Sequence, residues 1–169
     1  MKKIILVRHA ESSLSSFQIS DFDRPLSENG ILESNLISSK LKENKISIDY
    51  FISSSANRAL STAKIFAENL NFNFQNIVVN DNIYNASISH LIDIIYTIPN
   101  NFNEIIVFGH NPSLHKLSQN LTNSIIYEFP TCSAFCIKFD IENWSDLNNG
   151  QKEFFISKFI LIFIYNPIS

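Results

Sequence analysis

The fold class is decided by the stretch KIILVRH at residues 3–9. Its apolar part is short and ends at two polar residues, a pattern typical of a buried parallel strand. Residues 104–108 repeat the pattern and run into the sequence GHNP at residues 109–112. Asn111 is a favourable N-cap and Pro112 a favourable first helical residue, so we predict a helix after this second strand. We therefore expect both runs to be buried strands, each with a histidine close to its carboxyl end.

Strand and helix patterns alternate along the rest of the chain. Strand-like runs occupy residues 3–7, 49–53, 76–80, 104–108, 132–140 and 154–165. Between them, apolar residues recur at helical spacing in four groups: Ile31, Leu32, Leu36, Ile37 and Leu41; Ala59, Ala63, Phe66 and Leu70; Ile88, Leu91, Ile92 and Ile95; Leu114, Leu117 and Leu121. This alternation predicts an α/β fold of three layers, with a mostly parallel central sheet flanked by helices. The last two runs, joined by a polar loop, predict an added hairpin, and residues 12–23 predict a mobile loop.

Length and composition exclude several classes of protein. The chain has 169 residues, and we expect residues 1–169 to form a single domain. Its 16 acidic and 13 basic side chains leave a net charge of −3, which argues against a nucleic-acid-binding surface. Residues 154–165 fall short of the roughly 18 apolar residues that span a bilayer, so we expect no membrane segment. The two cysteines, Cys132 and Cys136, fit a reducing compartment, so we expect a cytoplasmic protein.

Arginine is rare in this chain. The sequence contains ten lysines but only three arginines, Arg8, Arg24 and Arg58. Lysine can replace arginine on a solvated surface, but not where a planar guanidinium must hold an oxyanion through two hydrogen bonds. Each arginine therefore carries more functional weight here than it would in an average sequence.

Two histidines and two arginines are expected at one edge of the predicted sheet. Arg8 and His9 end the first strand, Arg58 lies in the opening turn of the helix after the second, and His110 follows the fourth. In open α/β sheets, ligands bind beyond the carboxyl ends of the strands. Arginines and helix N-termini bind phosphoryl oxygens, while a neutral imidazole can attack phosphorus and a protonated one can stabilise negative charge. No carboxylate stands at ligand spacing from these histidines, so we expect no metal ion.

Taken together, four motifs resemble the histidine phosphatase superfamily, also called phosphoglycerate mutase-like, and most closely its short SixA-type phosphohistidine phosphatase branch. The motifs are LVRHA at residues 6–10, DRPLSENG at 23–30, SSSANRALSTA at 53–63 and VFGHNP at 107–112. The resemblance covers nearly the whole chain and implies a phosphatase that needs no cofactor. It implies that His9 is the nucleophile and that Arg8, Arg58 and His110 complete the phosphate pocket. Arg24 is expected either at the pocket edge, where it would bind substrate, or in an ion pair with Asp23.

Two departures from the family pattern bear on the substrate. Many relatives have an acidic residue near position 85 that serves as general acid, whereas this chain has Asn85; Asp81 and Glu11 are nearby alternatives. The connections are also too short for the large lid insertion of the mutases and acid phosphatases. Without a general acid, expelling an alkoxide is hard, whereas a protonated imidazole leaves readily. Both points favour phosphohistidine on a protein as the substrate.

Two other functions remain open from the sequence. One is a small-molecule phosphate-ester phosphatase on the same scaffold, with Glu11 or Asp81 as the acid. The other is a phosphoryl-binding regulatory module with little turnover. The presence of both His9 and His110 argues against the second alternative.

Overall fold

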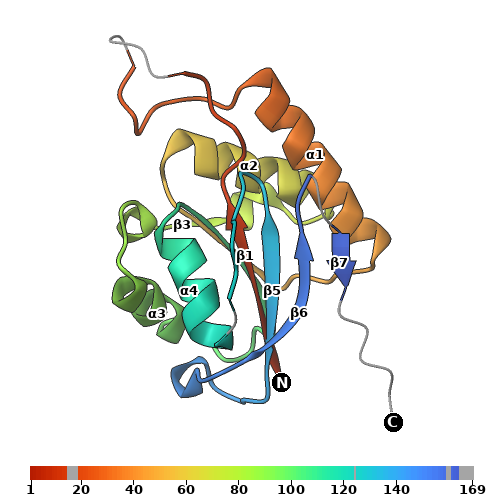
Figure 1. The fold of residues 1–169 in the computed structure, drawn as a ribbon, viewed down its shortest axis with the longest axis vertical. Coiled ribbons are helices and arrows are strands. Elements are labelled where there is room, and N and C mark those ends of the chain that lie inside the picture. Colours follow the sequence, from red (N-terminus) through yellow and green to blue (C-terminus); the bar gives the residue numbers. More distant parts are fainter. Residues whose placement is uncertain (15–18, 124, 159–160, 164–169) are drawn as a thin grey trace.

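The computed structural model describes residues 1–14, 19–123, 125–158 and 161–163. Within these residues a seven-stranded sheet has the order β3-β2-β4-β1-β5-β6-β7 (Figure 1). The strands are β1 (Lys2–Arg8), β2 (Tyr50–Ser53), β3 (Val78–Val79), β4 (Glu104–Gly109), β5 (Ala134–Phe139), β6 (Gln151–Ile156) and β7 (Leu161–Phe163). The helices are α1 (Glu28–Glu43), α2 (Asn57–Asn69), α3 (Ile88–Tyr96) and α4 (Ser113–Thr122), with short 3-10 turns at Phe74–Asn76, Asp81–Ile83 and Trp144–Asp146.

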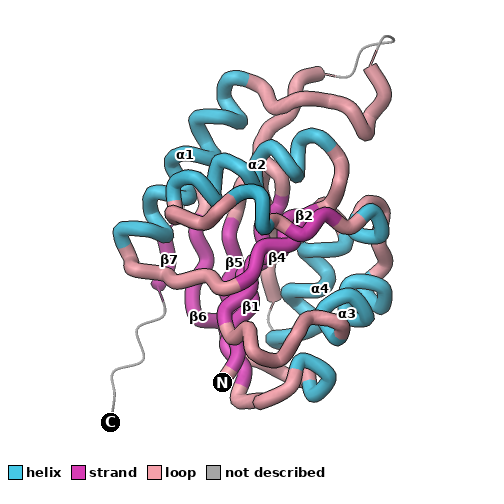
Figure 2. Tube along the Cα trace, turned by 180° about the vertical axis from the view of Figure 1, so that it is seen from behind, coloured by secondary structure: helices cyan, strands magenta, loops and turns pink. Residues whose placement is uncertain are grey.

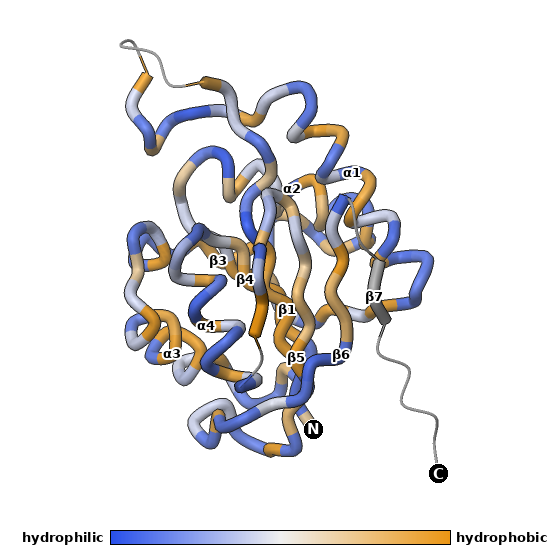
Figure 3. Tube along the Cα trace, in the orientation of Figure 1, coloured by the Kyte–Doolittle hydropathy of each residue, from blue (hydrophilic) through white to orange (hydrophobic). Residues whose placement is uncertain are grey.

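The sheet separates two hydrophobic layers. Strands β1 to β4 pair in parallel, and β5, β6 and β7 continue the sheet in antiparallel pairing from β1 outward. Because side chains alternate along a strand, Ile4 and Leu6 of β1 pack on the layer formed with α3 and α4, whereas Ile5 and Val7 pack with α1 and α2. Figure 2 shows the two helix pairs on opposite sides of the sheet, and Figure 3 shows hydrophobic residues concentrated along the strands. The predicted three-layer α/β fold is confirmed.

The prediction of one final strand over residues 154–165 was wrong. In the described residues the run forms two antiparallel strands: β6 ends at Ile156, and β7 pairs back on it. Residues 159–160 and 164–165 of the predicted strand lie outside the described part of the chain. The reversal begins after Ser157, where Lys158 leaves the sheet and its Nζ donates to the buried carboxylate of Glu33 on α1. The antiparallel part of the sheet is therefore larger than the single hairpin that the sequence indicated.

The apolar face predicted for α1 is only partly buried. Ile37 and Leu41 lie in the core, but Ile31, Leu32 and Leu36 are exposed. The buried face is completed by small or polar residues, namely Gly30, Glu33, Ser34 and Ser38. The hydroxyl of Ser34 donates to the carbonyl of Gly30 at 2.8 Å, and that of Ser38 to the carbonyl of Ser34 at 2.6 Å. Because these hydroxyls are satisfied inside the helix, they can be buried at low cost.

Two other predicted boundaries shift in the structure. Helix α4 begins at Ser113, with Pro112 as its N-cap, so Asn111 is not the cap. The side chain of Asn111 instead donates to the carbonyl of Phe129 at 2.9 Å. The strand predicted over residues 76–80 contracts to the two-residue edge strand β3, because a 3-10 turn precedes it.

Of the loop predicted over residues 12–23, residues 15–18 lie outside the described part. No helix among the described residues has the length and apolar character that a bilayer crossing requires.

Candidate active site

The carboxyl ends of three neighbouring parallel strands meet at one edge of the sheet. In the register of the sheet, Arg8 of β1 lies beside Gly109 of β4, and Phe108 of β4 lies beside Ser53 of β2. His9 therefore follows β1 next to the point where His110 follows β4. Helix α2 begins four residues after the end of β2 and presents Arg58 in its first turn. The structure brings His9, Arg58 and His110 together, as the sequence predicted.

His9 has one ring nitrogen bound to the backbone and the other turned to Arg58. Its Nδ1 lies 2.8 Å from the carbonyl oxygen of Ala10, which can only accept, so Nδ1 carries the proton. Its Nε2 therefore holds a lone pair, and it accepts a hydrogen bond from Nε of Arg58 at 3.2 Å. Burial, with a smaller contribution from the charges of Arg58 and Arg8, lowers the pKa of His9 to about 4. At neutral pH the imidazole is uncharged, with its lone pair on Nε2.

His110 lies across from His9, with the ring centroids 5.1 Å apart. Its Nε2 lies 2.9 Å from the hydroxyl of Ser54, and its buried Nδ1 has no hydrogen-bond partner among the described residues. Burial, followed by the proximity of His9 and Arg58, lowers the pKa of His110 to about 3. The imidazole is therefore neutral in the free protein, and it would become a cation only beside a bound anion that raises its pKa.

Arg8 is the second guanidinium of the candidate site. Its Nη1 donates to the carbonyl of Phe129 at 3.0 Å. Its Nε is buried and has no hydrogen-bond partner within the described residues. A buried donor without a partner costs free energy, and a bound oxyanion would supply the missing acceptor. The arrangement of Arg8 thus fits the predicted role in phosphate binding.

Arg24 pairs with Asp21 and not with Asp23. Its Nη1 lies 3.0 Å from Oδ1 of Asp21, and its other nitrogens donate to the hydroxyl of Ser12 and the carbonyl of Ser13. Asp23 instead accepts from the hydroxyl of Ser20 at 2.6 Å. Of the two alternatives for Arg24, the ion pair with Asp23 is therefore wrong. Through Asp21, Arg24 lies next to Arg58, at the edge of the site.

Asp21 is a site residue that the sequence did not reveal. Its Oδ2 accepts from Nη2 of Arg58 at 2.9 Å and from the hydroxyl of Tyr84 at 2.9 Å, and its carbonyl accepts from Nη1 of Arg58. The hydrogen bond from Tyr84, together with those from Arg24 and Arg58, lowers the pKa of Asp21 to about 2. The Tyr84 ring also packs edge-on against His110, with the centroids 5.4 Å apart. The only signal in the sequence was an acidic residue three positions before Arg24.

The three positions considered for a general acid carry no carboxyl group in hydrogen-bond contact with His9 or His110. Asn85 is exposed, in the left-handed region at a φ of 56°. The carboxylate of Glu11 accepts from Ser27 at 2.8 Å and from Asn29 at 2.9 Å, at the start of α1. Asp81 lines a separate cavity together with Tyr84 and Asn85. Among the described residues, no group of three or more histidine, cysteine or acidic side chains could hold a metal ion.

Curated relatives match most of the chain. An uncharacterized protein of Mycobacterium tuberculosis is 27% identical over 154 residues, which cover 85% of this chain and 93% of that protein. An uncharacterized chloroplastic protein of Arabidopsis thaliana is 27% identical over 157 residues, which cover 86% of this chain and 70% of the relative.

Solved structures with the same fold include phosphatases of several specificities. The protein histidine phosphatase SixA complexed with tungstate has a TM-score of 0.80 at 23% identity, covering 92% of this chain and 96% of that one. A mycobacterial glucosyl-3-phosphoglycerate phosphatase has a TM-score of 0.65 at 12% identity, covering 90% and 97%. Phosphoserine phosphatase from Entamoeba histolytica, in complex with 3-phosphoglyceric acid, has a TM-score of 0.61 at 16% identity, covering 94% and 98%.

The family profile matches the part of the chain that holds His9, Arg24 and Arg58. The profile described as histidine phosphatase superfamily (branch 1) covers residues 4–90, slightly more than half of the 169 residues. His110 lies beyond the matched segment, and the parallel pairing of β1 with β4 brings it to the same edge of the sheet. The chain belongs to the histidine phosphatase superfamily.

Proposed function

We propose that this protein is a metal-independent phosphatase that uses His9 as its nucleophile and removes the phosphoryl group from phosphohistidine on a protein. The observation that carries the proposal is the state of His9. Its proton is held on Nδ1 by the carbonyl of Ala10, its Nε2 lies 3.2 Å from Nε of Arg58, and the ring of His110 lies 5.1 Å from its own. A neutral imidazole among cationic donors is the arrangement that attack on a phosphoryl group requires.

In the first step, Nε2 of His9 attacks phosphorus in line with the leaving group. The new bond joins Nε2 to phosphorus, and the bond between phosphorus and the substrate nitrogen breaks. The electron pair goes to the leaving imidazole, which departs neutral when its other nitrogen is protonated. Arg8 and Arg58 bind the equatorial oxygens, and their charge stabilises the transition state. A phosphoryl oxygen replaces His9 as the acceptor for Nε of Arg58.

In the second step, water attacks the phosphoryl group on His9. The nitrogen–phosphorus bond breaks, its electron pair returns to Nε2, and inorganic phosphate is released. His110 is neutral in the free protein, and the bound phosphoryl group raises its pKa. The protonated imidazole then donates a hydrogen bond to a phosphoryl oxygen and stabilises the negative charge through both steps.

The choice of a phosphoramidate over a phosphate ester rests on the acids near the site. An alkoxide leaving group needs a proton donor that is still protonated at neutral pH. The carboxyl nearest to Arg58 is Asp21, whose pKa is lowered to about 2, so it is ionised. Glu11 is bound to Ser27 and Asn29 at α1. A protonated imidazole leaves without such a donor, so phosphohistidine fits this set of residues better than an ester.

A small-molecule phosphate ester is the second candidate substrate. It is favoured by the fold likeness to glucosyl-3-phosphoglycerate phosphatase and phosphoserine phosphatase, although the TM-scores of 0.65 and 0.61 are lower than the 0.80 of SixA. In this case Asp81 or Glu11 would supply the proton. The pH dependence of ester hydrolysis in Asp81→Asn and Glu11→Gln tests this second candidate. If one of these carboxyl groups is the general acid, its loss removes the alkaline limb of the profile of rate against pH.

The proposal includes the organisation and location of the protein. Residues 1–169 act as one domain, since both hydrophobic layers share a single sheet. Cys132 and Cys136 are free thiols, which fits a reducing cytoplasm. A phosphorylated protein is the partner, as it is for an enzyme that acts on phosphohistidine.

The test compares substrates and variants of the purified protein. Phosphate release is measured from a histidine-phosphorylated peptide and from a panel of phosphate esters, with and without a chelator. We expect turnover of the phosphohistidine peptide that the chelator leaves unchanged. We expect His9→Ala to lose turnover and still bind tungstate, whereas the exposed His90→Ala serves as the control and keeps both. Strong ester turnover without phosphoramidate turnover would reverse the substrate assignment, and full activity of His9→Ala would refute the mechanism.

A further inference from the structure

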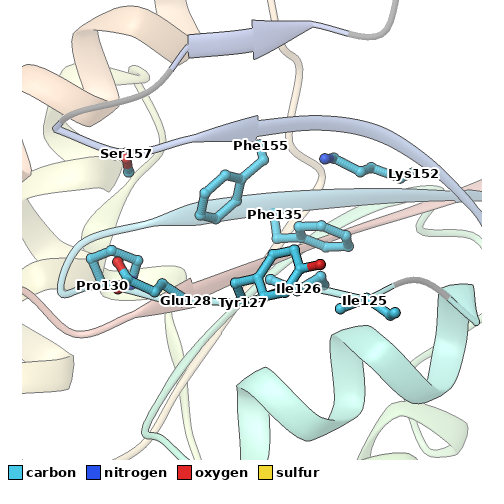
Figure 4. A pocket seen from close by; sticks show the side chains of 9 residues that line it. All are labelled: Ile125, Ile126, Tyr127, Glu128, Pro130, Phe135, Lys152, Phe155 and Ser157. Carbon is cyan, nitrogen blue, oxygen red and sulfur yellow. The ribbon is translucent and has the colours of Figure 1, made fainter.

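A cavity of about 500 Å³ lies on the face of β5 and β6 that is turned toward α4, and we call it the outer cavity. Figure 4 shows the aromatic side chains of Phe135 and Phe155 at its floor and Tyr127 across from them. In the part of the chain that the structure describes, no helix covers β6 on this face, and the irregular segment of residues 125–130 forms the remaining wall (Figure 1). The outer cavity has the size of a typical ligand site.

The side chains of the outer cavity combine aromatic surface with two charges of opposite sign, Lys152 beside the aromatic rings and the exposed Glu128. Phe135 and Phe155 are buried, with ring centroids 6.0 Å apart, and Nζ of Lys152 lies 5.8 Å and 5.9 Å from these rings. Within the described residues Lys152 has no ion pair with a carboxylate. Two large apolar side chains at the rim stand in solvent, since Tyr127 is 88% exposed and Ile125 is 78% exposed. Such a surface recognises an apolar side chain with a carboxylate beside it.

The outer cavity adjoins a second cavity that reaches Arg8 of the candidate active site. This second cavity of about 500 Å³, the inner cavity, is lined by Arg8 and shares Tyr127, Glu128 and Pro130 with the outer one. Arg8 immediately precedes His9, and its Nη1 is bound to the carbonyl of Phe129 within the same segment. A ligand whose phosphoryl group is bound by Arg8 can therefore extend over Tyr127 into the outer cavity.

We infer that the outer cavity is the docking site for the protein that carries the phosphohistidine, and that it receives a large apolar side chain of that protein with a neighbouring carboxylate paired to Lys152. This inference rests on the proposed function and names the surface that selects its substrate. A small phosphorylated molecule held at Arg8 would end within the inner cavity. A folded protein presents the phosphohistidine and a second contact at the same time, so it engages both cavities.

The experiment uses synthetic histidine-phosphorylated peptides. In one set, a Phe-Asp pair is placed at successive positions around the phosphohistidine; in the reference set, the pair is Ala-Asn. Steady-state kinetics are measured for the unmodified protein, Tyr127→Ala, Lys152→Gln and the control Phe74→Ala. Phe74 is 55% exposed and precedes β3, at the opposite edge of the sheet. The phosphoramidate ion is measured as a substrate that is too small to reach the outer cavity.

For at least one placement, we expect the Phe-Asp peptide to have a KM about tenfold below that of its Ala-Asn reference. Tyr127→Ala and Lys152→Gln each remove most of this preference, whereas Phe74→Ala keeps it. Turnover of the phosphoramidate ion stays unchanged in all three variants, because none of them alters Arg8, His9, Arg58 or His110. Since Tyr127 is almost fully exposed, its truncation leaves the fold intact, which circular dichroism verifies.

Three results would overturn the docking site. The first is that no placement of the Phe-Asp pair lowers KM. The second is an equal rise in KM for the phosphoramidate ion in Tyr127→Ala, which would assign the cavity to a small substrate. The third is a dimer in sedimentation that Tyr127→Ala converts to a monomer, which would assign the surface to a second copy of this chain. If the unmodified protein hydrolyses neither the peptides nor the phosphoramidate ion, the proposed function itself fails, and the docking site falls with it.

Discussion

The chemistry of the site depends on two imidazoles that stay neutral among arginines. Both are buried, and their rings lie 5.1 Å apart. Removing water from around a charged ring costs more than nearby hydrogen bonds return, so burial is the main reason that both pKa values fall. The free protein therefore holds His9 ready as a nucleophile, and His110 responds to the anion that binds.

A titration followed by NMR of the imidazole nitrogens tests this arrangement. We expect His9 to stay neutral until the pH falls to about 4 and His110 until about 3, with the His9 proton on Nδ1. Tungstate should raise the pKa of His110 by roughly four units, to near neutral pH, because a bound anion favours the charged ring. A His9 that titrates near 6.5, or that carries its proton on Nε2, would contradict the assignment.

Asp21 has the role of a positioning residue for Arg58. Its carboxylate and carbonyl hold both Nη atoms of that guanidinium. We expect Asp21→Asn to lower kcat about tenfold, because Arg58 loses its orientation, while KM does not rise, because a negative charge beside the phosphoryl group is removed. Asp23→Asn is the matched control, since Asp23 bonds to Ser20 and to neither arginine. A variant with unchanged kcat would exclude the positioning role.

The residues at the ends of strands could be predicted, whereas the residues on the loop could not. His9, Arg58 and His110 follow buried apolar runs directly, and parallel strands bring such positions together whatever the details of packing. Asp21 and Asp23 stand on either side of Phe22 in a segment without periodicity. The partner of Arg24 therefore depends on the path of the loop, which the residue types alone do not determine.

At the level of elements, the N-terminus of α1 packs closely against the segment that follows the nucleophile. A Cβ atom on Gly30 would lie 2.0 Å from the carbonyl oxygen of Glu11. The same oxygen accepts from the backbone nitrogen of Ser27 at 3.0 Å, so α1 and the residues after His9 are held together. Glycine is required here by this close approach of two backbones.

Gly30→Ala should therefore affect both stability and catalysis. We expect the added methyl group to lower the free energy of unfolding by about 1–3 kcal/mol and Tm by roughly 2–12 °C, and kcat to fall because the segment after His9 moves. Differential scanning calorimetry and steady-state kinetics measure the two effects. Ser39→Ala, an exposed position of the same helix, is the control and should change neither. A Gly30→Ala protein as stable and active as the unmodified one would show that the contact is not close.

Periodicity located the elements well and failed where a polar side chain decided the packing. The predicted face of α1 included Leu32, which is exposed, because apolar spacing alone could not reveal that Ser34 and Ser38 satisfy their hydroxyls within the helix. The run at residues 154–165 was predicted as one strand because only Ser157 and Lys158 interrupt its apolar residues. Lys158 contacts Glu33, 125 positions earlier in the chain, and this contact between distant positions is not a local property of the sequence.

For the molecule as a whole, the two lowered histidine pKa values make folding dependent on pH. Unfolded histidine titrates near 6.5, so between this pH and about 4 the unfolded chain binds more protons than the folded one. Stability is therefore full above pH 6.5 and declines as the pH falls, by about 2 kcal/mol per imidazole between pH 6.5 and 5. The carboxyl of Asp21 adds to the pH dependence of stability only at lower pH, between the ordinary pKa of an aspartate and its pKa of about 2 in the folded protein.

Chemical denaturation at several pH values measures this effect. We expect the unmodified protein to lose stability from pH 7 to pH 5 and the double variant His9→Ala/His110→Ala to lose much less. His90→Ala, which changes an exposed histidine, should keep the full pH dependence. If the free energy of unfolding fell equally steeply with pH in the unmodified protein and the double variant, the two buried rings would not account for the pH dependence.

Trapping the phosphorylated protein tests the central claim most directly. The protein is mixed with a histidine-phosphorylated peptide carrying labelled phosphate, quenched in alkali within the first turnover, and mapped by mass spectrometry. The account predicts a label that is stable to alkali, lost in acid and located on His9, and no label in His9→Ala. A label on another residue, or release of phosphate by His9→Ala at the rate of the unmodified protein, would contradict it.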